Sequence, residues 1–149
     1  MTYSLHINGK LILSGCLIIN PNKELLLLCS RKWNHYETPG GKVSLRDCSD
    51  PNNIPIDDLA RTATRELCEE LGGDIVIDEL KYFGKTEFRL PNSKSAIAHK
   101  FTTSILYGIP IVNEPEKFSC IDWLPINHLD KYHISPDLVN LLPKLKNDL

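Results

Sequence analysis

Three glutamates fall within five residues of the stretch RELCEELGG, which begins at Arg65. On a helix, residues three and four positions apart are neighbours, so Glu66 lies beside both Glu69 and Glu70. Like charges at this spacing destabilise a helix by roughly a few tenths of a kcal/mol, and a divalent cation would offset that repulsion. Carboxylate oxygens are the hard ligands that Mg²⁺ or Mn²⁺ prefers. The alternative interpretation is a solvated acidic helix face that Arg61 and Arg65 balance.

The chemistry of such a cation points to a phosphorylated substrate. Mg²⁺ loses its water reluctantly and usually binds through a few carboxylates together with phosphate oxygens of the substrate. Upstream of the glutamates, Gly40 and Gly41 would let the backbone approach a ligand closely, and a carbonyl there is a further hard ligand. Arg65 neighbours the carboxylates and is placed to orient one of them or to contact phosphate.

Length and charge limit the class of protein. The chain has 149 residues, which is the typical length of one domain and is enough for a sizeable core. Its hydrophobic content of 42% and charged content of 24% are ordinary for a soluble globular protein. A formal net charge of −2 offers no basic field for non-specific binding of nucleic acid. We therefore expect a single domain over residues 1–149 with a small-molecule partner and no nucleic acid.

No membrane segment or secretory signal is predicted, because the longest apolar run, residues 25–29, is far too short to span a bilayer. The cysteines are scattered, odd in number and without a CxxC motif: Cys16, Cys29, Cys48, Cys68 and Cys120. This usage indicates free thiols in a reducing compartment, and hence a cytoplasmic location. Cys16 and Cys29 lie in apolar runs and are expected in the core, whereas Cys48 lies in a polar loop and is expected to be exposed.

Several elements must position the glycines and the glutamates. Residues 11–19 and 24–30 are apolar and predict a hairpin around the turn at 20–22. Residues 44–55 are polar and predict a surface loop. The helix is predicted over residues 55–71, with Pro55 at its first position and Gly72 after its end. Its buried stripe is expected to consist of Ala63, Leu67 and Leu71.

The second half of the chain predicts strands followed by one more helix. Strands are predicted over residues 75–77, 81–90, 98–109 and 118–124, with a hairpin loop at 91–93. Ser135 as N-cap and Pro136 at the first position begin a helix whose apolar face is Leu138, Leu141, Leu142 and Leu145. Pro143 is expected to kink or break it. The order of elements predicts a mixed α/β (or α+β) domain with helices packed on a mixed sheet.

The glycine turn and the glutamate helix together resemble the motif of a known family. Pro39-Gly40-Gly41-Lys42-Val43, followed by a helix bearing Arg65-Glu66-Leu67-Cys68-Glu69-Glu70-Leu71-Gly72, is similar to the Nudix box of Nudix hydrolases. The preceding hairpin and residues 114–125 resemble the usual flanks, so the likeness covers most of the chain. It implies an α/β/α sandwich with a mixed β-sheet, the Nudix-box helix on one side and a C-terminal helix on the other.

Three departures from the family pattern are visible. The interval from Gly41 to the helix is about ten residues longer, and residues 44–55 carry the insertion. The middle glutamate of the box is absent, and Asp57 stands at that place counting back from Arg65. Gly73 replaces the final apolar residue. The Arg-Glu-x-x-Glu-Glu core is intact.

The resemblance implies Mg²⁺-dependent (or Mn²⁺-dependent) hydrolysis of a nucleoside diphosphate linked to another moiety. Glu69 and Glu70 are then metal ligands, and the Gly40 carbonyl completes the inner shell. Glu66 is either a ligand or the group that orients and deprotonates water, and Arg65 holds Glu66. A further carboxylate outside the box is common in the family, and Glu116 or Glu114 is the candidate here, with an exposed loop acid as the alternative.

Substrate recognition must come from elsewhere in the chain. Aromatic residues that could line a base-stacking pocket are Trp33, Tyr36, Phe88, His99, Phe101 and Tyr107, although each alone fits core packing equally well. Basic residues near the glycine turn that could reach phosphates are Arg31, Lys32 and Lys42.

The C-terminal flank resembles small enzymes of the MutT type. That likeness favours hydrolysis of a (deoxy)nucleoside triphosphate to monophosphate plus pyrophosphate, by a monomer or homodimer. The alternatives are a nucleotide-sugar or dinucleoside-polyphosphate pyrophosphohydrolase, and a nucleotide-binding module of the same fold with little activity. An RNA-processing pyrophosphohydrolase is disfavoured because a basic stripe is missing.

Overall fold

A mixed sheet lies at the centre of the computed structural model, which describes residues 3–148. Its strands are β1 (His6–Ile7), β2 (Lys10–Ile18), β8 (Ser95–Thr103) and β7 (Lys81–Arg89) in that order, with β5 (Gly40–Lys42) also paired to β2. β2 and β8 run parallel, and the remaining pairs are antiparallel. β7 and β8 form the hairpin predicted around residues 91–93.

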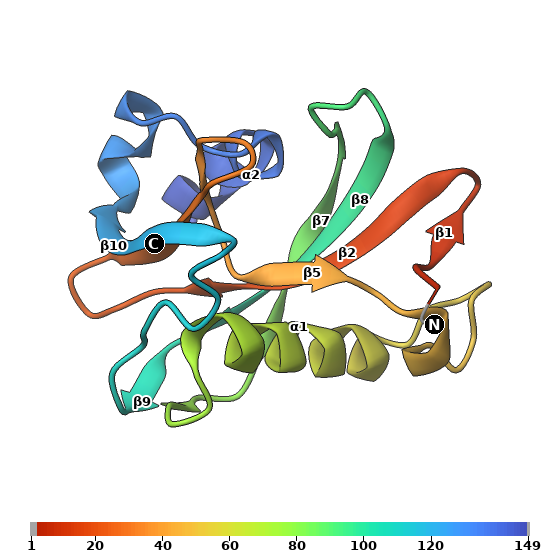
Figure 1. Ribbon diagram of the computed structural model, residues 1–149, viewed down its shortest axis with the longest axis horizontal. Helices are drawn as coiled ribbons and strands as arrows, with labels where there is room; N and C mark the ends of the chain where they lie inside the picture. Colours follow the sequence, from red (N-terminus) through yellow and green to blue (C-terminus); the bar gives the residue numbers. More distant parts are fainter. Residues whose placement is uncertain (1–2, 149) are drawn as a thin grey trace.

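Two helices cover opposite faces of this sheet, as Figure 1 shows. α1 (Ile56–Leu71) packs its stripe of Ala63, Leu67 and Leu71 into one core, which also contains Phe101. α2 (Pro136–Asn147) packs its four leucines into a second core on the other face. The predicted α/β/α sandwich is therefore confirmed.

The predicted hairpin over residues 11–30 is wrong, because its two strands do not pair with each other beyond the turn. β2 and β3 (Glu24–Ser30) exist, but they are joined only by the bridge between Ile19 and Leu25. β3 instead pairs with β10 (Phe118–Pro125) and β4 (Tyr36–Glu37) in a second, three-stranded sheet. The reason is competition for hydrogen bonds, because β8 pairs along one edge of β2 while β1 and β5 pair with its other edge.

The last predicted strand of the middle region is divided in two. The strand is interrupted at Ser104, after β8. It continues as β9 (Ile105–Tyr107), which pairs with β6 (Val76–Ile77) away from the central sheet. Two 3₁₀ helices complete the secondary structure, η1 (Leu45–Asp47) and η2 (Ile126–Lys131). Among the described residues, no helix combines the length and the apolar character needed to cross a membrane.

The ends of both helices follow the predicted signals closely. α1 begins one residue later than predicted, with Pro55 as its N-cap, and it ends at Gly72, whose φ of +93° suits glycine. α2 begins at Pro136 after Ser135, as predicted. The predicted break at Pro143 is wrong, since α2 continues to Asn147. The donor that Pro143 lacks would have bonded the carbonyl of Val139, which lies on the exposed side and is open to water.

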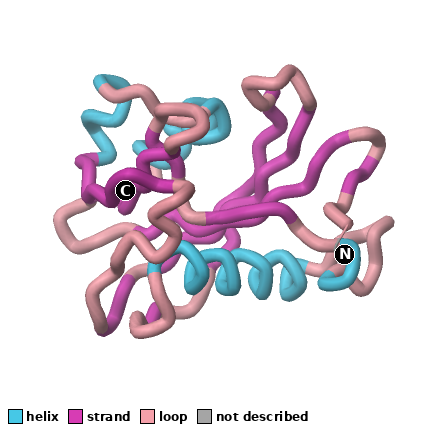
Figure 2. The backbone as a smooth tube through the Cα atoms, viewed as in Figure 1, coloured by secondary structure: helices cyan, strands magenta, loops and turns pink. Residues whose placement is uncertain are grey.

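The polar loop before α1 is better anchored than its composition predicts. It contains η1, visible as a short helical stretch in Figure 2. Cys48 is buried in the α1 core, which corrects the expected exposure. Asp58 of α1 accepts hydrogen bonds from the Ser49 backbone N–H and hydroxyl, both at 2.8 Å, and pairs with Arg61. These bonds hold the loop against the start of the helix.

Candidate active site

The glycine turn packs directly on the acidic side of α1. The backbone N–H of Gly40 donates a 2.8 Å hydrogen bond to Oε1 of Glu70, whose side chain is only 4% exposed. This burial excludes Glu70 from the solvated acidic helix face that was the alternative interpretation. Glu70 lies next to Leu67 on the helix and turns toward β5, so its carboxyl group is withdrawn from water.

Glu66 occupies the neighbouring position against Gly41. A Cβ atom at Gly41 would fall on the carboxylate of Glu66, so any other residue there would displace that side chain. The backbone of Gly40 is equally confined, because a Cβ there would lie 2.8 Å from the Cα of Gly15 on β2. The turn therefore needs its glycines for close approach: one toward the carboxylates and the other toward the central sheet.

Glu69 and Arg65 lie at the outer edge of this cluster. Both are exposed, and Arg65 lies 3.8 Å from a carboxylate oxygen of Glu66 and 3.8 Å from one of Glu69. Arg65 also lies 3.5 Å from Asp47 of η1. These are ion pairs at the protein surface, so Arg65 is near Glu66 without holding it by a hydrogen bond.

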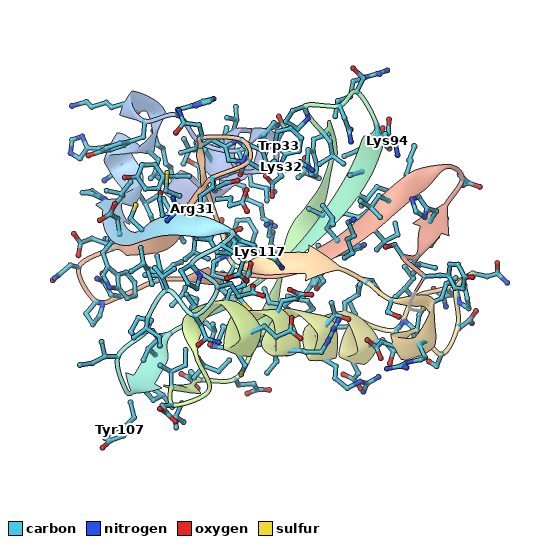
Figure 3. All side chains as sticks on the ribbon, viewed as in Figure 1. Arg31, Lys32, Trp33, Lys94, Tyr107 and Lys117 are labelled. Carbon is cyan, nitrogen blue, oxygen red and sulfur yellow. The ribbon has the colours of Figure 1, made fainter. Side chains whose placement is uncertain are left out.

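One more carboxylate, from outside α1, comes from the loop before β10. Glu114 is largely buried, and its Oε1 atom has no hydrogen-bond partner within residues 3–148. Its other oxygen lies 3.3 Å from Nζ of Lys117, which Figure 3 places beside β5 above α1. Glu116 is exposed to solvent on the same loop. Of the two candidates from the sequence, the structure favours Glu114.

Burial and mutual repulsion shift the acidities of these carboxyl groups. Burial raises the pKa of Glu70 to about 9, the Gly40 N–H acts to lower it, and the carboxylates of Glu66, Glu37 and Glu114 raise it further. Burial and then Glu69 raise the pKa of Glu66, against the opposing effect of Arg65. Both shifts favour the protonated, neutral carboxyl, so this environment penalises several negative charges unless a cation compensates them.

The donor set fits a hard divalent cation. It consists of carboxylate oxygens from the buried Glu70, the partly buried Glu66 and Glu114, and the exposed Glu69, and one buried oxygen of Glu114 has no partner among the described residues. In the described part of the chain, no three His, Cys, Asp or Glu side chains already form a complete metal site. The carboxylates would therefore have to turn toward a common ion when one binds.

Asp57 lies apart from this cluster. It is exposed in the first turn of α1 and lines a shallow groove with Arg61, Arg65 and residues 77–80. Because Asp57 precedes Glu66 by more than two helical turns, it lies well along the helix from the glycine turn. The missing middle glutamate is therefore not replaced by Asp57 at the carboxylate cluster.

A pocket of about 260 Å³ opens on the other side of the glycine turn. Gly40, Gly41 and Lys42 form its border with the carboxylate cluster. Its apolar walls come from Leu13, Trp33, Phe88, Leu90, Pro91 and Pro136. Figure 3 shows Trp33 and Lys32 on the loop between β3 and β4. Lys32 lies over the Trp33 ring, with Nζ 4.6 Å from the ring centroid.

The polar part of this pocket consists of two hydrogen-bonded pairs. Nζ of Lys100 lies 2.9 Å from Oδ2 of Asp137 and donates a 2.7 Å hydrogen bond to Oγ1 of Thr38. His35 and Glu37 form a second pair at 2.8 Å. Burial acts to raise the pKa of Asp137, but the charge of Lys100 and the hydrogen bonds to the carboxylate together outweigh it and hold that pKa below its usual range.

Only some of the predicted substrate-binding residues line this pocket. Trp33, Phe88 and Lys42 do, and Lys32 contacts it through Trp33. Tyr36 instead donates a 2.8 Å hydrogen bond to Asp122, and Tyr107 is exposed on β9. The prediction is wrong for the β8 residues, since Phe101 is buried in the α1 core and His99 bonds the Tyr82 hydroxyl at 3.0 Å. Burial and Lys85 lower the pKa of His99 to about 4.

The alternation of side chains along β8 explains this error. Successive residues of a strand point to opposite faces, so Lys100, between His99 and Phe101, faces the pocket. The sequence analysis overlooked Lys100, Asp137, Ser135, Thr38, His35 and Glu37. A lysine inside an apolar strand was the one available signal, since lysine is seldom buried without a partner.

Comparisons with known proteins agree with the geometry. The NUDIX domain family model matches residues 12–145. No curated protein sequence matches this chain. The MutT protein from Methanosarcina mazei Go1 superposes with a TM-score of 0.69 at 20% identity, covering 96% of this chain and 98% of that one.

Two further solved structures show the same fold. The NUDIX domain of Shewanella oneidensis NrtR, crystallised with ADP ribose, gives a TM-score of 0.71 at 13% identity and covers 95% of this chain and 90% of its own. The MutT NUDIX hydrolase from Burkholderia pseudomallei gives 0.64 at 21% identity, over 79% of this chain and 84% of its own.

Proposed function

This chain belongs to the Nudix hydrolase family, whose members act on nucleoside diphosphate derivatives, and we propose that it hydrolyses a nucleoside triphosphate to monophosphate and pyrophosphate. Nudix hydrolases generally use divalent metals, and Mg²⁺ is the proposed ion here, with Mn²⁺ as a substitute.

The position and size of the pocket support a triphosphate. The pocket and the carboxylate cluster share the glycine turn, so a substrate can place its nucleoside in one and its phosphates across the other. A volume of about 260 Å³ lies below the usual range of roughly 300–1,000 Å³ for small-molecule sites. Such a pocket suits a single nucleoside better than a dinucleotide.

The residues that would hold Mg²⁺ are Glu66, Glu69, Glu70 and Glu114, with the Gly40 carbonyl. When bound, the ion supplies charge neutralisation on the phosphate oxygens and a lower pKa for the attacking water. Glu66 orients that water and accepts its proton, or serves as a ligand. Lys117, near Glu66 and Glu70, and Lys42, at the pocket border, are placed to contact phosphate. Positioning and electrostatics carry most of the catalysis, because phosphoryl transfer requires little covalent chemistry from the protein.

Nucleotide sugars, dinucleoside polyphosphates and binding without turnover remain the alternatives. The altered box, with Asp57 far from the cluster, is the observation that favours a binding module. A binding module predicts nucleotide binding with no metal-dependent release of phosphate or pyrophosphate.

The compartment is proposed from the cysteines. The free cysteines, Cys16, Cys29, Cys48, Cys68 and Cys120, support a reducing compartment such as the cytoplasm.

The test is pyrophosphate and phosphate release from triphosphates, nucleotide sugars and dinucleotides with Mg²⁺ or Mn²⁺. The proposal expects triphosphates to react fastest and Glu69→Gln to abolish turnover. Glu79→Gln is the matched control, since Glu79 is exposed and lines the groove of Asp57 instead of joining the carboxylate cluster. Faster turnover of ADP ribose or dinucleotides would contradict the proposed substrate, and binding without turnover of any compound would contradict the activity.

A further inference from the structure

We propose that Lys100, Asp137 and Ser135 read the hydrogen-bonding edge of the substrate's nucleobase, and that they select a base with a ring carbonyl beside a ring N–H. This inference rests on the proposed function, because it assigns the pocket to the nucleoside of the same substrate. The class comprises hypoxanthine, guanine, uracil and thymine, and it excludes adenine and cytosine.

The first observation is an incompletely used ammonium. Lys100 is 5% exposed and lines the pocket. An ammonium carries three N–H donors, and Thr38 and Asp137 accept two of them. No third acceptor for Lys100 is present among residues 3–148, so one buried donor remains for a ligand in the pocket.

The second observation is an unpartnered hydroxyl on the same wall. Ser135 is 4% exposed and lines the pocket, and its Oγ atom has no hydrogen-bond partner within the described chain. It stands at the N-cap of α2 without capping the helix. A buried hydroxyl without a partner is unfavourable, and a ligand that bonds it would recover that loss.

The third observation is that the pocket offers a donor beside an acceptor. The Lys100 ammonium and the Asp137 carboxylate are 2.9 Å apart, a spacing that matches neighbouring groups on a base edge. A carbonyl oxygen suits the ammonium because it has two lone pairs, and the adjacent ring N–H suits the carboxylate. With the ribose and phosphates held at the glycine turn, the base enters in one orientation. Adenine or cytosine would then place an amino group against the ammonium and an unprotonated ring nitrogen against the carboxylate.

The surrounding walls fit a flat ring. Trp33 and Phe88 supply aromatic surface, and Leu13, Leu90 and Pro136 complete an apolar slot around the polar floor. Because Lys100 and Asp137 neutralise each other, the floor suits an uncharged polar edge better than a charged group.

Two pairs of nucleotides test the inference cleanly. ITP and ATP differ at the six-position edge of the purine, and UTP and CTP differ in the same way at the pyrimidine. The expected result is a kcat/KM at least about tenfold higher for ITP than for ATP and for UTP than for CTP, equivalent to about 1.4 kcal/mol. Equal values within each pair would overturn the inference and leave the proposed hydrolysis intact.

Variants separate base reading from a purely structural ion pair. Lys100→Met with Asp137→Leu removes both charges together, which a buried pair often tolerates without loss of stability. This double variant should fold and bring the ITP/ATP ratio close to one. Ser135→Ala should leave the melting temperature unchanged and raise KM several-fold for ITP with little effect on kcat. Ser119→Ala is the control, because Ser119 is exposed on β10.

A binding measurement keeps the test independent of turnover. Calorimetric titration of IMP and AMP into the wild-type protein should give tighter binding of IMP by about tenfold, with or without metal. A folded double variant that retains the wild-type IMP preference would overturn the inference. If no nucleotide is hydrolysed but IMP is still preferred, the proposed function fails while the base reading stands.

Discussion

The two sides of the glycine turn treat charge in opposite ways. On the helix side, Glu66, Glu70 and Glu114 crowd together, and the contacts that relieve them are one backbone N–H and surface cations. On the pocket side, Lys100 is matched with Asp137. The first side is arranged to accept a cation and phosphates, and the second to accept a neutral polar edge. A few residues of backbone therefore separate two electrostatic environments with different ligands.

The helix side should respond most strongly in activity. Glu66→Gln removes a charge that the proposed chemistry needs, and we expect kcat to fall by about 10³-fold, the scale seen when one charge-stabilising group is lost. The same change relieves like-charge repulsion, so the melting temperature in chelator should rise or stay constant. A lower melting temperature would show that the helix side is compensated after all.

The pocket side should respond most strongly in stability. Lys100→Met leaves Asp137 buried without its partner, and the free energy of unfolding should fall by about 3–5 kcal/mol. Urea unfolding would measure this, with Lys85→Met as the control because Lys85 has no ion pair among the described residues. An unchanged urea midpoint would mean that the ion pair contributes nothing to the fold.

The metal-free protein should lose stability as pH rises. Glu70 has its pKa raised from an ordinary 4.5 to about 9, so between these values the folded chain holds a proton that the unfolded chain releases. Its contribution is complete below about pH 4.5 and disappears as the pH rises through about 9. Melting temperatures in chelator should show this decline, and Glu70→Gln should flatten it. If Glu70→Gln shows the same decline of melting temperature with pH as the wild type, the decline does not come from Glu70.

The smallest effect distinguishes two acids of one loop. Glu114→Gln should weaken apparent Mg²⁺ affinity by about tenfold, because its partly buried carboxylate acts electrostatically on both Glu66 and Glu70 and has one oxygen without a partner among the described residues. Glu116→Gln should have no measurable effect, since Glu116 is exposed. Metal titrations of activity would compare them, and the reverse order would restore Glu116 as the carboxylate from outside the helix.

Local signals explain what could be predicted from the sequence. The stripe of Ala63, Leu67 and Leu71 repeats with the helical period, and Gly72 ends the helix, so α1 was predicted to within one residue. Glu66, Glu69 and Glu70 follow from the same spacing, although the burial of Glu70 does not. That burial depends on the approach of Gly40, which only the folded chain reveals.

The unpredicted features all depend on contacts between distant segments. The parallel pairing of β2 with β8 excludes the simple hairpin, and no local pattern encodes it. Which face of β8 lines the pocket depends on where α2 packs, so His99 and Phe101 were chosen instead of Lys100. Asp137 becomes a pocket residue only when α2 brings it within ion-pair distance of Lys100.

The contact between Gly15 and Gly40 has a consequence for the tolerance of the chain to change. Each glycine occupies the space that a side chain on the other would need, with 2.8 Å between a Cβ at Gly40 and the Cα of Gly15. Neither can be replaced first, and replacing both makes the clash worse, so no second mutation at this pair can rescue the first. In a random library the two positions should behave as a single locus at which every amino-acid change is lost.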